Sequence, residues 1–269
     1  MMSDRHTDEV GVPMDVAGGE GWVRAPSSVS SEIVRRVDEA LRHMYGPKML
    51  APNGDPVGEL IHIMLTQNTS DANSDRTYAA LRSAYSSWEA VAAASPSEIA
   101  EVIRMGGLAD IKAARIIEVL SRIEADYGCI SLDAIDSMND DEAFDYLTSL
   151  PGVGPKTAAC VLLFALGRPV FPVDTHVHRV ANRIGLVDTK QPAKTQKELG
   201  AVVPEDIVYQ LHMNMVAHGR RTCRARRPKC EECALRDECA WAIAASCKAG
   251  DKGVSEESVA ERVAEGGRA

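Results

Sequence analysis

The sequence predicts an almost entirely α-helical protein, and three observations support this fold class. Apolar residues recur at helical spacing along most of the chain. Several of these segments begin with a helix-capping residue and end at glycine. The only strand-like run, RPVFPVD at 168–174, is short and interrupted by prolines, which cannot donate to a sheet ladder. We therefore expect about ten helices and no solenoid repeat.

The first two predicted helices are recognised by their ends. Residues 30–46 carry apolar side chains at helical spacing and finish at a glycine. Residues 55–71 begin with Asp55 as the N-cap and Pro56 at the first helical position, where proline is favoured. These start and stop signals predict one helix in each segment.

Capping signals also bound the helices that follow. Residues 95–107 place Ser95 and Glu98 at the spacing of a capping box and finish at a glycine pair. Residues 110–128 and 140–150 continue the apolar periodicity. The middle of the chain is therefore predicted to be a series of amphipathic helices.

Length and composition fit a globular protein of one or two domains. The 269 residues are 45% hydrophobic and 26% charged. No apolar run reaches the about 18 residues that a membrane span requires, so we expect no membrane partner. Residues 1–27 lack the apolar core of a signal peptide, and we expect them to be the disordered tail of a cytoplasmic protein. Residues 248–269 are predicted to be a second, polar tail.

The net charge of −9 argues weakly against a nucleic-acid partner, but the charge is unevenly distributed. The predicted tail 1–27 holds five acidic residues and two basic ones. The segment RRTCRARRPK at 220–229 holds six Lys or Arg and no acid. A local basic patch of this kind is compatible with contact to DNA phosphates.

Four of the seven cysteines lie within 17 residues, in the pattern C-x6-C-x2-C-x5-C. They are Cys223, Cys230, Cys233 and Cys239. In a cytosolic chain this density indicates a metal or cluster site rather than disulfides. Zinc and a [4Fe–4S] cluster both accept four thiolates, so the spacing leaves both open.

The segment LPGVGPKTAA at 150–159 joins two predicted helices through a glycine hairpin. Gly152 and Gly154 permit left-handed backbone angles and leave amide groups open to an anion. The helix that follows adds the positive end of its dipole. The hairpin is therefore a candidate phosphate clamp, although a simple turn has the same pattern. Lys156 stands on the first turn of the apolar helix after it.

Asp174, in PVDTHVHRVANRIGL, lies between an extended segment and an amphipathic helix. One interpretation is a helix N-cap without further role. In the other, Asp174 works with Lys156, because a partly desolvated lysine near a carboxylate can lose its proton and attack an electrophilic carbon. His176 and His178 are expected to be structural or near-site polar groups, because no third metal ligand stands at a suitable spacing.

The hairpin lysine, the later aspartate and the four-cysteine loop, in that order, resemble the endonuclease III family of DNA glycosylases in the HhH-GPD superfamily. The resemblance spans about 30–245 and is carried by LPGVGPKTA, VDTHVHRV and the cysteine loop. It implies a six-helix domain at 57–168 and a cluster-bearing helical domain made from 28–56 and 169–247. DNA would bind in the groove between the two domains.

The resemblance also implies roles for single residues. Lys156 would be the attacking amine, Asp174 the catalytic carboxylate, and the four cysteines the ligands of a [4Fe–4S] cluster. In MLTQNTSD the family places a polar residue that fills the gap left by the flipped base. Alignment puts Asn68 there with Gln67 beside it, and both are candidates. In GGLADIK, Leu108 would be the wedge that enters the base stack.

Two further features concern DNA contact. The family often has an aromatic residue after the wedge leucine and then an amide, whereas this chain has Ala109 and Asp110, which leaves the opposite-base contacts and the substrate range open. The first cysteine loop carries four cations that we expect to meet phosphates. These cations are Arg224, Arg226, Arg227 and Lys229.

The implied function is base excision repair. A damaged base must leave the duplex before the enzyme can reach it. The leading hypothesis is a bifunctional glycosylase and abasic-site (AP) lyase that removes oxidised pyrimidines from duplex DNA through a lysine Schiff base and β-elimination. We expect it to act as a monomer at the nucleoid. A second hypothesis keeps the fold but assigns mismatched thymine or uracil, or an ultraviolet photoproduct, as the substrate. A third is a non-catalytic DNA-binding or redox-sensing iron–sulfur protein.

Overall fold

The computed structural model describes residues 29–251, and all regular secondary structure in this range is helical. The predicted tail 1–27 and most of the predicted tail 248–269 lie outside the described residues. The α-helices are α1 (Ser31–Tyr45), α2 (Pro56–Thr66), α3 (Asp71–Ala84), α4 (Trp88–Ala93), α5 (Pro96–Ile103), α6 (Ala109–Tyr127), α7 (Asp140–Ser149), α8 (Pro155–Cys160), α9 (Thr175–Ile184), α10 (Pro192–Gly200), α11 (Val208–Arg221) and α12 (Ala240–Asp251). The predicted all-α class is confirmed. The described residues hold twelve α-helices against about ten expected, because short helices show little periodicity.

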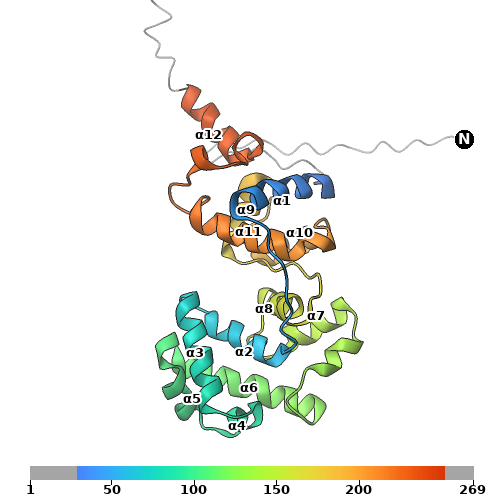
Figure 1. Ribbon diagram of the computed structural model, residues 1–269, viewed down its shortest axis with the longest axis vertical. Helices are drawn as coiled ribbons and strands as arrows, with labels where there is room; N and C mark the ends of the chain where they lie inside the picture. Colours follow the sequence, from blue (N-terminus) through green and yellow to red (C-terminus); the bar gives the residue numbers. More distant parts are fainter. Residues whose placement is uncertain (1–28, 252–269) are drawn as a thin grey trace, which may run out of the picture.

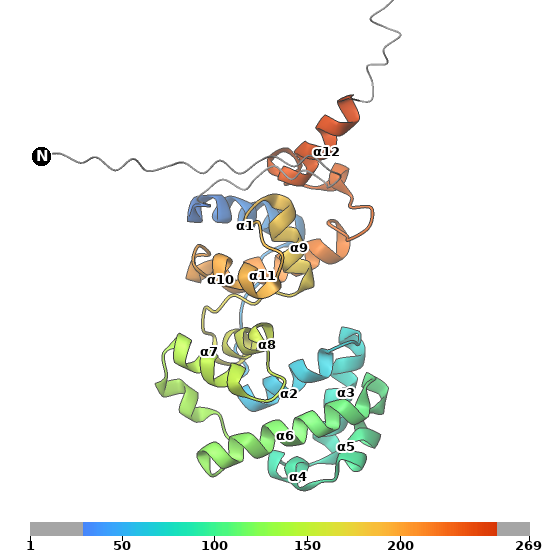
Figure 2. The ribbon, with the colours of Figure 1, turned by 180° about the vertical axis from the view of Figure 1, so that it is seen from behind.

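The helices form two lobes, which Figures 1 and 2 show from opposite sides. The hairpin lobe, residues 56–165, contains α2 to α8. The cysteine lobe, residues 31–45 and 175–251, contains α1 and α9 to α12. Helix α1 packs against α11 and not against its sequence neighbour α2. The chain therefore crosses between the lobes twice, at 46–55 and at 166–174.

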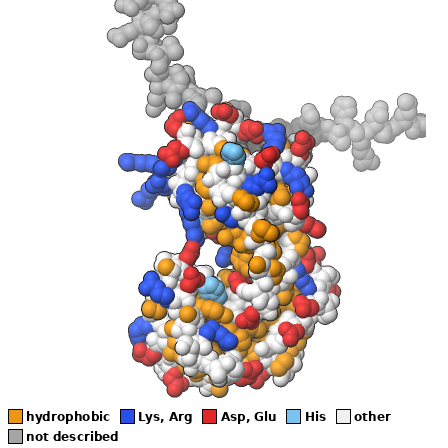
Figure 3. Space-filling model, in the orientation of Figure 1, with side chains coloured by type: hydrophobic (Ala, Val, Ile, Leu, Met, Phe, Trp, Pro, Cys, Tyr) orange, Lys and Arg blue, Asp and Glu red, His pale blue; other side chains and the backbone are white. Residues whose placement is uncertain are grey.

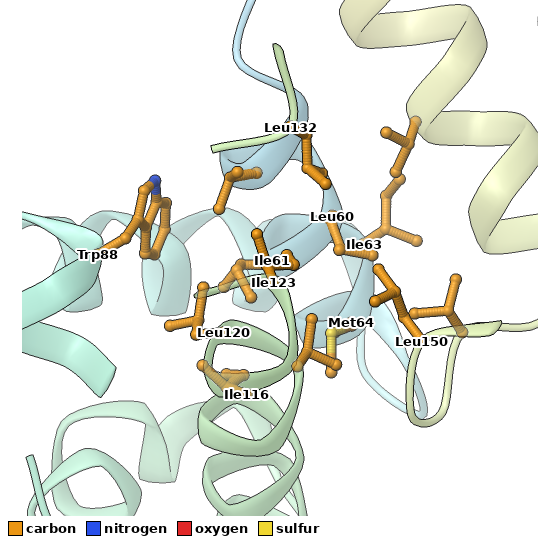
Figure 4. Packing of buried hydrophobic residues seen from close by; sticks show 14 of the residues in the cluster. Leu60, Ile61, Ile63, Met64, Trp88, Ile116, Leu120, Ile123, Leu132 and Leu150 are labelled. Atoms are coloured by element: carbon orange, nitrogen blue, oxygen red, sulfur yellow. The ribbon is translucent and has the colours of Figure 1, made fainter. Parts of the chain in front are cut away.

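The core of the hairpin lobe lies where α2 meets α6 (Figure 4). Fully or almost fully buried side chains from these two helices are Leu60, Ile61, Met64, Ile116, Leu120 and Ile123. Burying each such side chain contributes about 1.5–3 kcal/mol. The loops that follow α2 and precede α6 are therefore attached to two helices of the buried core.

A second cluster of buried residues joins α1, α9 and α11 in the cysteine lobe. The two clusters meet in the π-helical turn Val161–Ala165 that continues α8. Leu162 belongs to the first cluster and Leu163 to the second. A π-turn adds a residue to the helical repeat, so successive side chains can serve different cores.

The predicted helix caps are present. Asp55 caps α2 by accepting a hydrogen bond from the Gly58 amide at 2.8 Å. Ser95 and Glu98 form the expected capping box at the start of α5. The strand-like run 168–174 forms no strand and is the extended second crossing between the lobes. No helix within 29–251 is long and apolar enough to span a membrane.

Candidate active site and nucleic-acid interface

The glycine hairpin connects α7 to α8. The Val153 amide donates to the Leu150 carbonyl at 3.1 Å, which closes a tight turn. Gly152 has φ +73°, a left-handed conformation that favours glycine. Gly154 is the N-cap of α8 and provides no side-chain cap, so the first amides of this helix keep their hydrogen-bonding capacity. The hairpin therefore has the geometry expected of an anion-binding turn.

Lys156 and Asp174 lie on neighbouring helix starts, Lys156 in the first turn of α8 and Asp174 as the N-cap of α9. Asp174 Oδ1 accepts a hydrogen bond from the Val177 amide at 2.7 Å. Both side chains are half-buried. Both also interact electrostatically with the same two buried groups, His212 and Cys160. The structure thus brings the lysine and the carboxylate around one point between the lobes.

His212 of α11 fixes the backbone that leads to Asp174. Its Nδ1 lies 3.0 Å from the Pro172 carbonyl oxygen, which can only accept, so Nδ1 carries the proton. The ring is buried against Phe164 and Phe171. Burial lowers the pKa of His212 to about 4, and the charge of Asp174 opposes this shift. The imidazole is therefore neutral at pH 7 and leaves Nε2 as a bare acceptor.

Two more ionisable groups, Glu59 and Cys160, interact with Lys156. Burial raises the pKa of Glu59 of α2, whose carboxylate accepts a hydrogen bond from the Asn53 amide at 2.8 Å and interacts electrostatically with Lys156. The Cys160 thiol lies one helical turn after Lys156 and interacts with it electrostatically, and burial raises the pKa of this thiol to about 11. The predicted near-site residue His176 is half-buried and interacts electrostatically with Asp71.

The candidates for duplex intercalation occupy two exposed loops. Gln67 is the C-cap of α2, and both it and Asn68 are exposed. Asn68 has φ +55° and Leu108 has φ +54°, which is rare for residues other than glycine. Leu108 is 49% exposed at the start of α6, and Ile111, one turn on, is 63% exposed. The structure places apolar side chains on the surface where the wedge is predicted.

A cavity of about 100 Å³ joins these two loops to the hairpin. Its lining residues are Met64, Gln67, Ile111, Lys112, Arg115 and Gly152. The Arg115 guanidinium packs directly over Gly152, since a Cβ at that glycine would lie 2.2 Å from Nη1. The segments 67–68, 108–111 and 150–155 therefore form one continuous surface.

The four-cysteine loop encloses a separate, mostly apolar cavity lined by all four predicted ligands. Burial raises the pKa of Cys230, Cys233 and Cys239, and thiolates on the neighbouring cysteines raise it further. Arg183 Nη1 lies 3.5 Å from the sulfur of Cys223, the first of the four cysteines. No group of three or more His, Cys, Asp or Glu side chains in the described part of the chain is arranged to hold a metal ion.

The predicted phosphate-binding cations lie on the surface of the first cysteine loop. Arg224, Arg226 and Arg227 are exposed, whereas Lys229 is half-buried and pairs with Glu232 at 2.9 Å. Figure 3 shows Lys and Arg side chains gathered on the edge of the cysteine lobe, above a hollow between the two lobes. The basic side chains thus lie beside the hollow that separates the two lobes on this face.

Sequence reasoning missed Lys112, Arg115, His212 and Arg220. Arg220 of α11 forms an ion pair with Asp71 of α3, with distances of 2.5 and 3.2 Å, and this pair links the two lobes. Arg220 belongs to the basic run 220–229, which was a usable signal. The other three lie in ordinary amphipathic helices, and no sequence pattern separates them from surface or core residues.

The fold has two helical lobes and a glycine hairpin, with a half-buried lysine just after the hairpin and an aspartate that caps the next α-helix. These features define a helix–hairpin–helix protein with a candidate nucleophile. Residues 61–205 match the HhH-GPD superfamily of base excision DNA repair proteins. The chain is also 36% identical over 185 residues to endonuclease III of Thermotoga maritima, an alignment that covers 69% of this chain and 83% of that protein. The chain therefore belongs to the endonuclease III family of this superfamily.

Solved structures agree with this assignment. A non-covalent endonuclease III–DNA complex and a trapped endonuclease III–DNA covalent intermediate both superpose with a TM-score of 0.68 and 27% identity. In each case the match covers 80% of this chain and 98% of the other. The expected family is confirmed, and with it the class of DNA glycosylases and AP lyases.

Proposed function

We propose that this DNA glycosylase and AP lyase removes oxidised pyrimidines from duplex DNA, with Lys156 as nucleophile and Asp174 as the carboxylate that supports it. The observation that carries the proposal is the position of Lys156: directly after the hairpin turn and electrostatically linked, through His212 and Cys160, to Asp174. A phosphate held by the hairpin would bring the adjoining sugar to the lysine.

The first step is attack on the sugar. The Lys156 nitrogen forms a bond to C1′ as the bond from C1′ to the base breaks, and the base leaves with that electron pair and takes up a proton. Asp174 stabilises the positive charge that develops at the sugar. Its hydrogen bond to the Val177 amide keeps one carboxylate oxygen fixed and leaves the other for this role.

The second step cuts the strand. The C1′–O4′ bond breaks, O4′ takes up a proton, and the nitrogen loses one, giving an imine between Lys156 and the opened sugar. Loss of a proton from C2′ then expels the 3′ phosphate oxygen. Water hydrolyses the imine and returns the free lysine. The neutral His212 ring and the Glu59 carboxyl border this region, and both can exchange protons.

Duplex binding would use the continuous surface of the hairpin lobe together with the basic cysteine loop. The Gly152–Gly154 hairpin contacts the backbone of the lesion strand, Leu108 enters the stack, and Gln67 or Asn68 fills the gap. Arg224, Arg226, Arg227 and Lys229 contact phosphates from the other lobe. A single chain carries all of these groups, which supports action as a monomer.

We propose that the four cysteines bind a [4Fe–4S] cluster, because thiolates are the ligands that such a cluster takes and all four residues line one mostly apolar cavity. Cys223, Cys230, Cys233 and Cys239 would hold it. The cluster would cross-link the loop that bears the basic residues and so shape its phosphate contacts. A brown protein with visible charge-transfer absorption that is lost in Cys233→Ser is the expected result, and a colourless zinc protein would contradict it.

Borohydride trapping tests the chemistry. Wild-type protein should form a covalent adduct with duplex DNA containing an abasic site, and Lys156→Ala should abolish it. Lys194→Ala, which removes an exposed lysine of α10, is the matched control and should trap normally. DNA binding without an adduct in the wild type would favour the non-catalytic hypothesis. A panel of duplexes with oxidised pyrimidines, mismatched thymine or uracil, and ultraviolet photoproducts then decides among the substrates.

A further inference from the structure

Lys112 of α6 is a buried lysine with an unusual set of partners. Its side chain is 5% exposed, and its amino group donates to the Leu65 carbonyl at 2.8 Å and to the Gly106 carbonyl at 3.0 Å. Burial lowers its pKa. Both hydrogen-bond acceptors found for this amino group in the described residues are backbone carbonyl oxygens and not carboxylates. The amino group therefore holds two backbone segments.

The two carbonyls stand immediately before the two loops predicted to enter DNA. Leu65 is in the last turn of α2, where carbonyl oxygens lack helical partners, and Gln67 and Asn68 follow it. Gly106 ends the 3₁₀ turn Arg104–Gly106, and Leu108 follows two residues later. One amino group therefore ties both loops to α6.

Both loops hold left-handed backbone, at Asn68 and at Leu108. Asn tolerates this conformation, but for Leu108 it is strained and persists only where surrounding contacts enforce it. The Gly106 turn is held from its other side by α3, since a Cβ at Gly106 would lie 2.9 Å from Thr77 Oγ1. On the buried side, Lys112 holds the same turn through its hydrogen bond to the Gly106 carbonyl.

We propose that Lys112 is a positioning residue that holds the gap-filling loop and the wedge loop at one fixed separation, so that both enter the duplex together. The inference rests on the proposed function and deepens it. An aliphatic side chain of the same length would fill the site without the cost of desolvating an amine. What it could not do is bind two carbonyls from different loops.

The test separates duplex distortion from chemistry. Lys112→Met removes the donors at nearly constant volume, and Lys112→Arg restores donors, with the adjoining cavity of about 100 Å³ to receive the larger group. Ile116→Val, in the buried face of the same helix, is the control for lost stability alone. Each variant is measured with an abasic site in duplex DNA and with the same site in a single strand, which needs no unstacking.

We expect Lys112→Met to slow single-turnover cleavage of the duplex about tenfold or more, with the single-strand rate unchanged within about twofold. Lys112→Arg should recover most of the duplex rate, and Ile116→Val should keep the wild-type ratio of the two rates. Lys112→Met should also fail to raise the fluorescence of a 2-aminopurine placed beside the abasic site. Equal losses on both substrates, or a wild-type ratio, would overturn the proposal.

The fluorescence measurement also keeps the two proposals apart. If the wild type forms no adduct and cuts neither substrate, the proposed lyase chemistry fails. Unstacking by the wild type and its absence in Lys112→Met would still support the positioning role. An equal rise in 2-aminopurine fluorescence with the wild type and with Lys112→Met would refute the positioning role, whether or not the protein cuts DNA.

Discussion

Asp174 has a structural role and a proposed chemical role, and they depend on different properties of its side chain. Capping of α9 needs an oxygen that accepts from the Val177 amide, which an amide side chain also provides. Stabilising a developing positive charge needs the negative charge itself. One isosteric substitution therefore separates the two roles.

The free energy of unfolding of Asp174→Asn should lie within about 0.5 kcal/mol of the wild-type value, because Asn is as good an N-cap as Asp. Its single-turnover rate of base removal should fall about a hundredfold or more. In Asp174→Ala the rate of base removal should fall by a comparable factor, and the free energy of unfolding should also fall by about 1 kcal/mol because the cap is lost. Chemical denaturation and gel-based excision assays measure the two effects. An active Asp174→Asn protein would reduce Asp174 to a cap.

His212 makes stability depend on pH. Its folded-state pKa of about 4 lies below its ordinary value of 6.5, so protons bind the unfolded chain first as the pH falls. The stabilisation from neutral His212 is complete above about pH 6.5 and is lost towards pH 4. Between pH 7 and pH 5 the free energy of unfolding should fall by about 2 kcal/mol from this group. His212→Asn keeps a donor near the Pro172 carbonyl but cannot titrate. Its free energy of unfolding should therefore fall by about 2 kcal/mol less over this step, and an unchanged step would contradict the assignment.

Single residues were predictable from sequence where their type is out of place locally. Lys156 was found because a charge begins an apolar helix after a glycine turn. Lys112 escaped because a lysine in an amphipathic helix is normally a surface charge, and only the folded chain brings the Leu65 and Gly106 carbonyls to it. The partners of buried polar groups are set by tertiary contacts that local patterns do not contain.

At the scale of elements, the hairpin makes different demands on its two glycines. Gly152 has a positive φ and lies under the Arg115 guanidinium. Gly154 has φ −93°, and a Cβ there meets nothing within 4 Å. The pattern G-x-G alone does not distinguish them.

Gly152→Ala should destabilise the protein by about 1–2 kcal/mol because a Cβ is strained at this angle. If the turn holds one phosphate, the slope of log K against log salt should also become shallower by about 0.9. The free energy of unfolding of Gly154→Ala should lie within about 0.5 kcal/mol of the wild-type value. Denaturant titrations and binding measured at several salt concentrations provide both readouts. A Gly152→Ala protein with wild-type stability and slope would argue against the clamp.

Helix boundaries were well predicted where capping chemistry marks them, as at Asp55 and Ser95. They were poorly predicted where packing decides, as in the six-residue α4 and the π-turn Val161–Ala165. The first depends on hydrogen bonds between near neighbours. The second depends on which core a side chain meets, and that is settled by contacts distant in sequence.

At the scale of the whole molecule, the Asp71–Arg220 ion pair joins the lobes across the proposed DNA groove. Its side chains are 65% and 48% exposed, so the pair contributes at most about 1 kcal/mol to stability. Asp71→Asn should leave stability nearly unchanged and free Arg220 for phosphate. Duplex affinity at low salt should then rise about two- to tenfold, and the gain should shrink as salt rises. Unchanged or weaker binding, measured by anisotropy, would contradict this account.

The global charge of −9 was a poor guide to the partner, because binding depends on where charge lies. On the face in Figure 3, Lys and Arg side chains gather at one edge of the cysteine lobe, whereas acidic side chains are scattered. The joining of 28–56 to 169–247 in one domain was implied by the family resemblance and not by local residue patterns. It follows from α1 packing on α11, a contact between distant parts of the chain.

That contact has a consequence for synthesis on the ribosome. Helix α1 emerges early, yet its partners come late: Arg35 pairs with Asp206, 171 residues further on. The hairpin lobe is one uninterrupted segment, so it can fold as soon as it leaves the exit tunnel. The apolar face of α1 stays exposed until α9 and α11 have been synthesised and can pack against it. Lys156 is therefore part of a folded lobe before α9, which Asp174 caps, has packed in the other lobe.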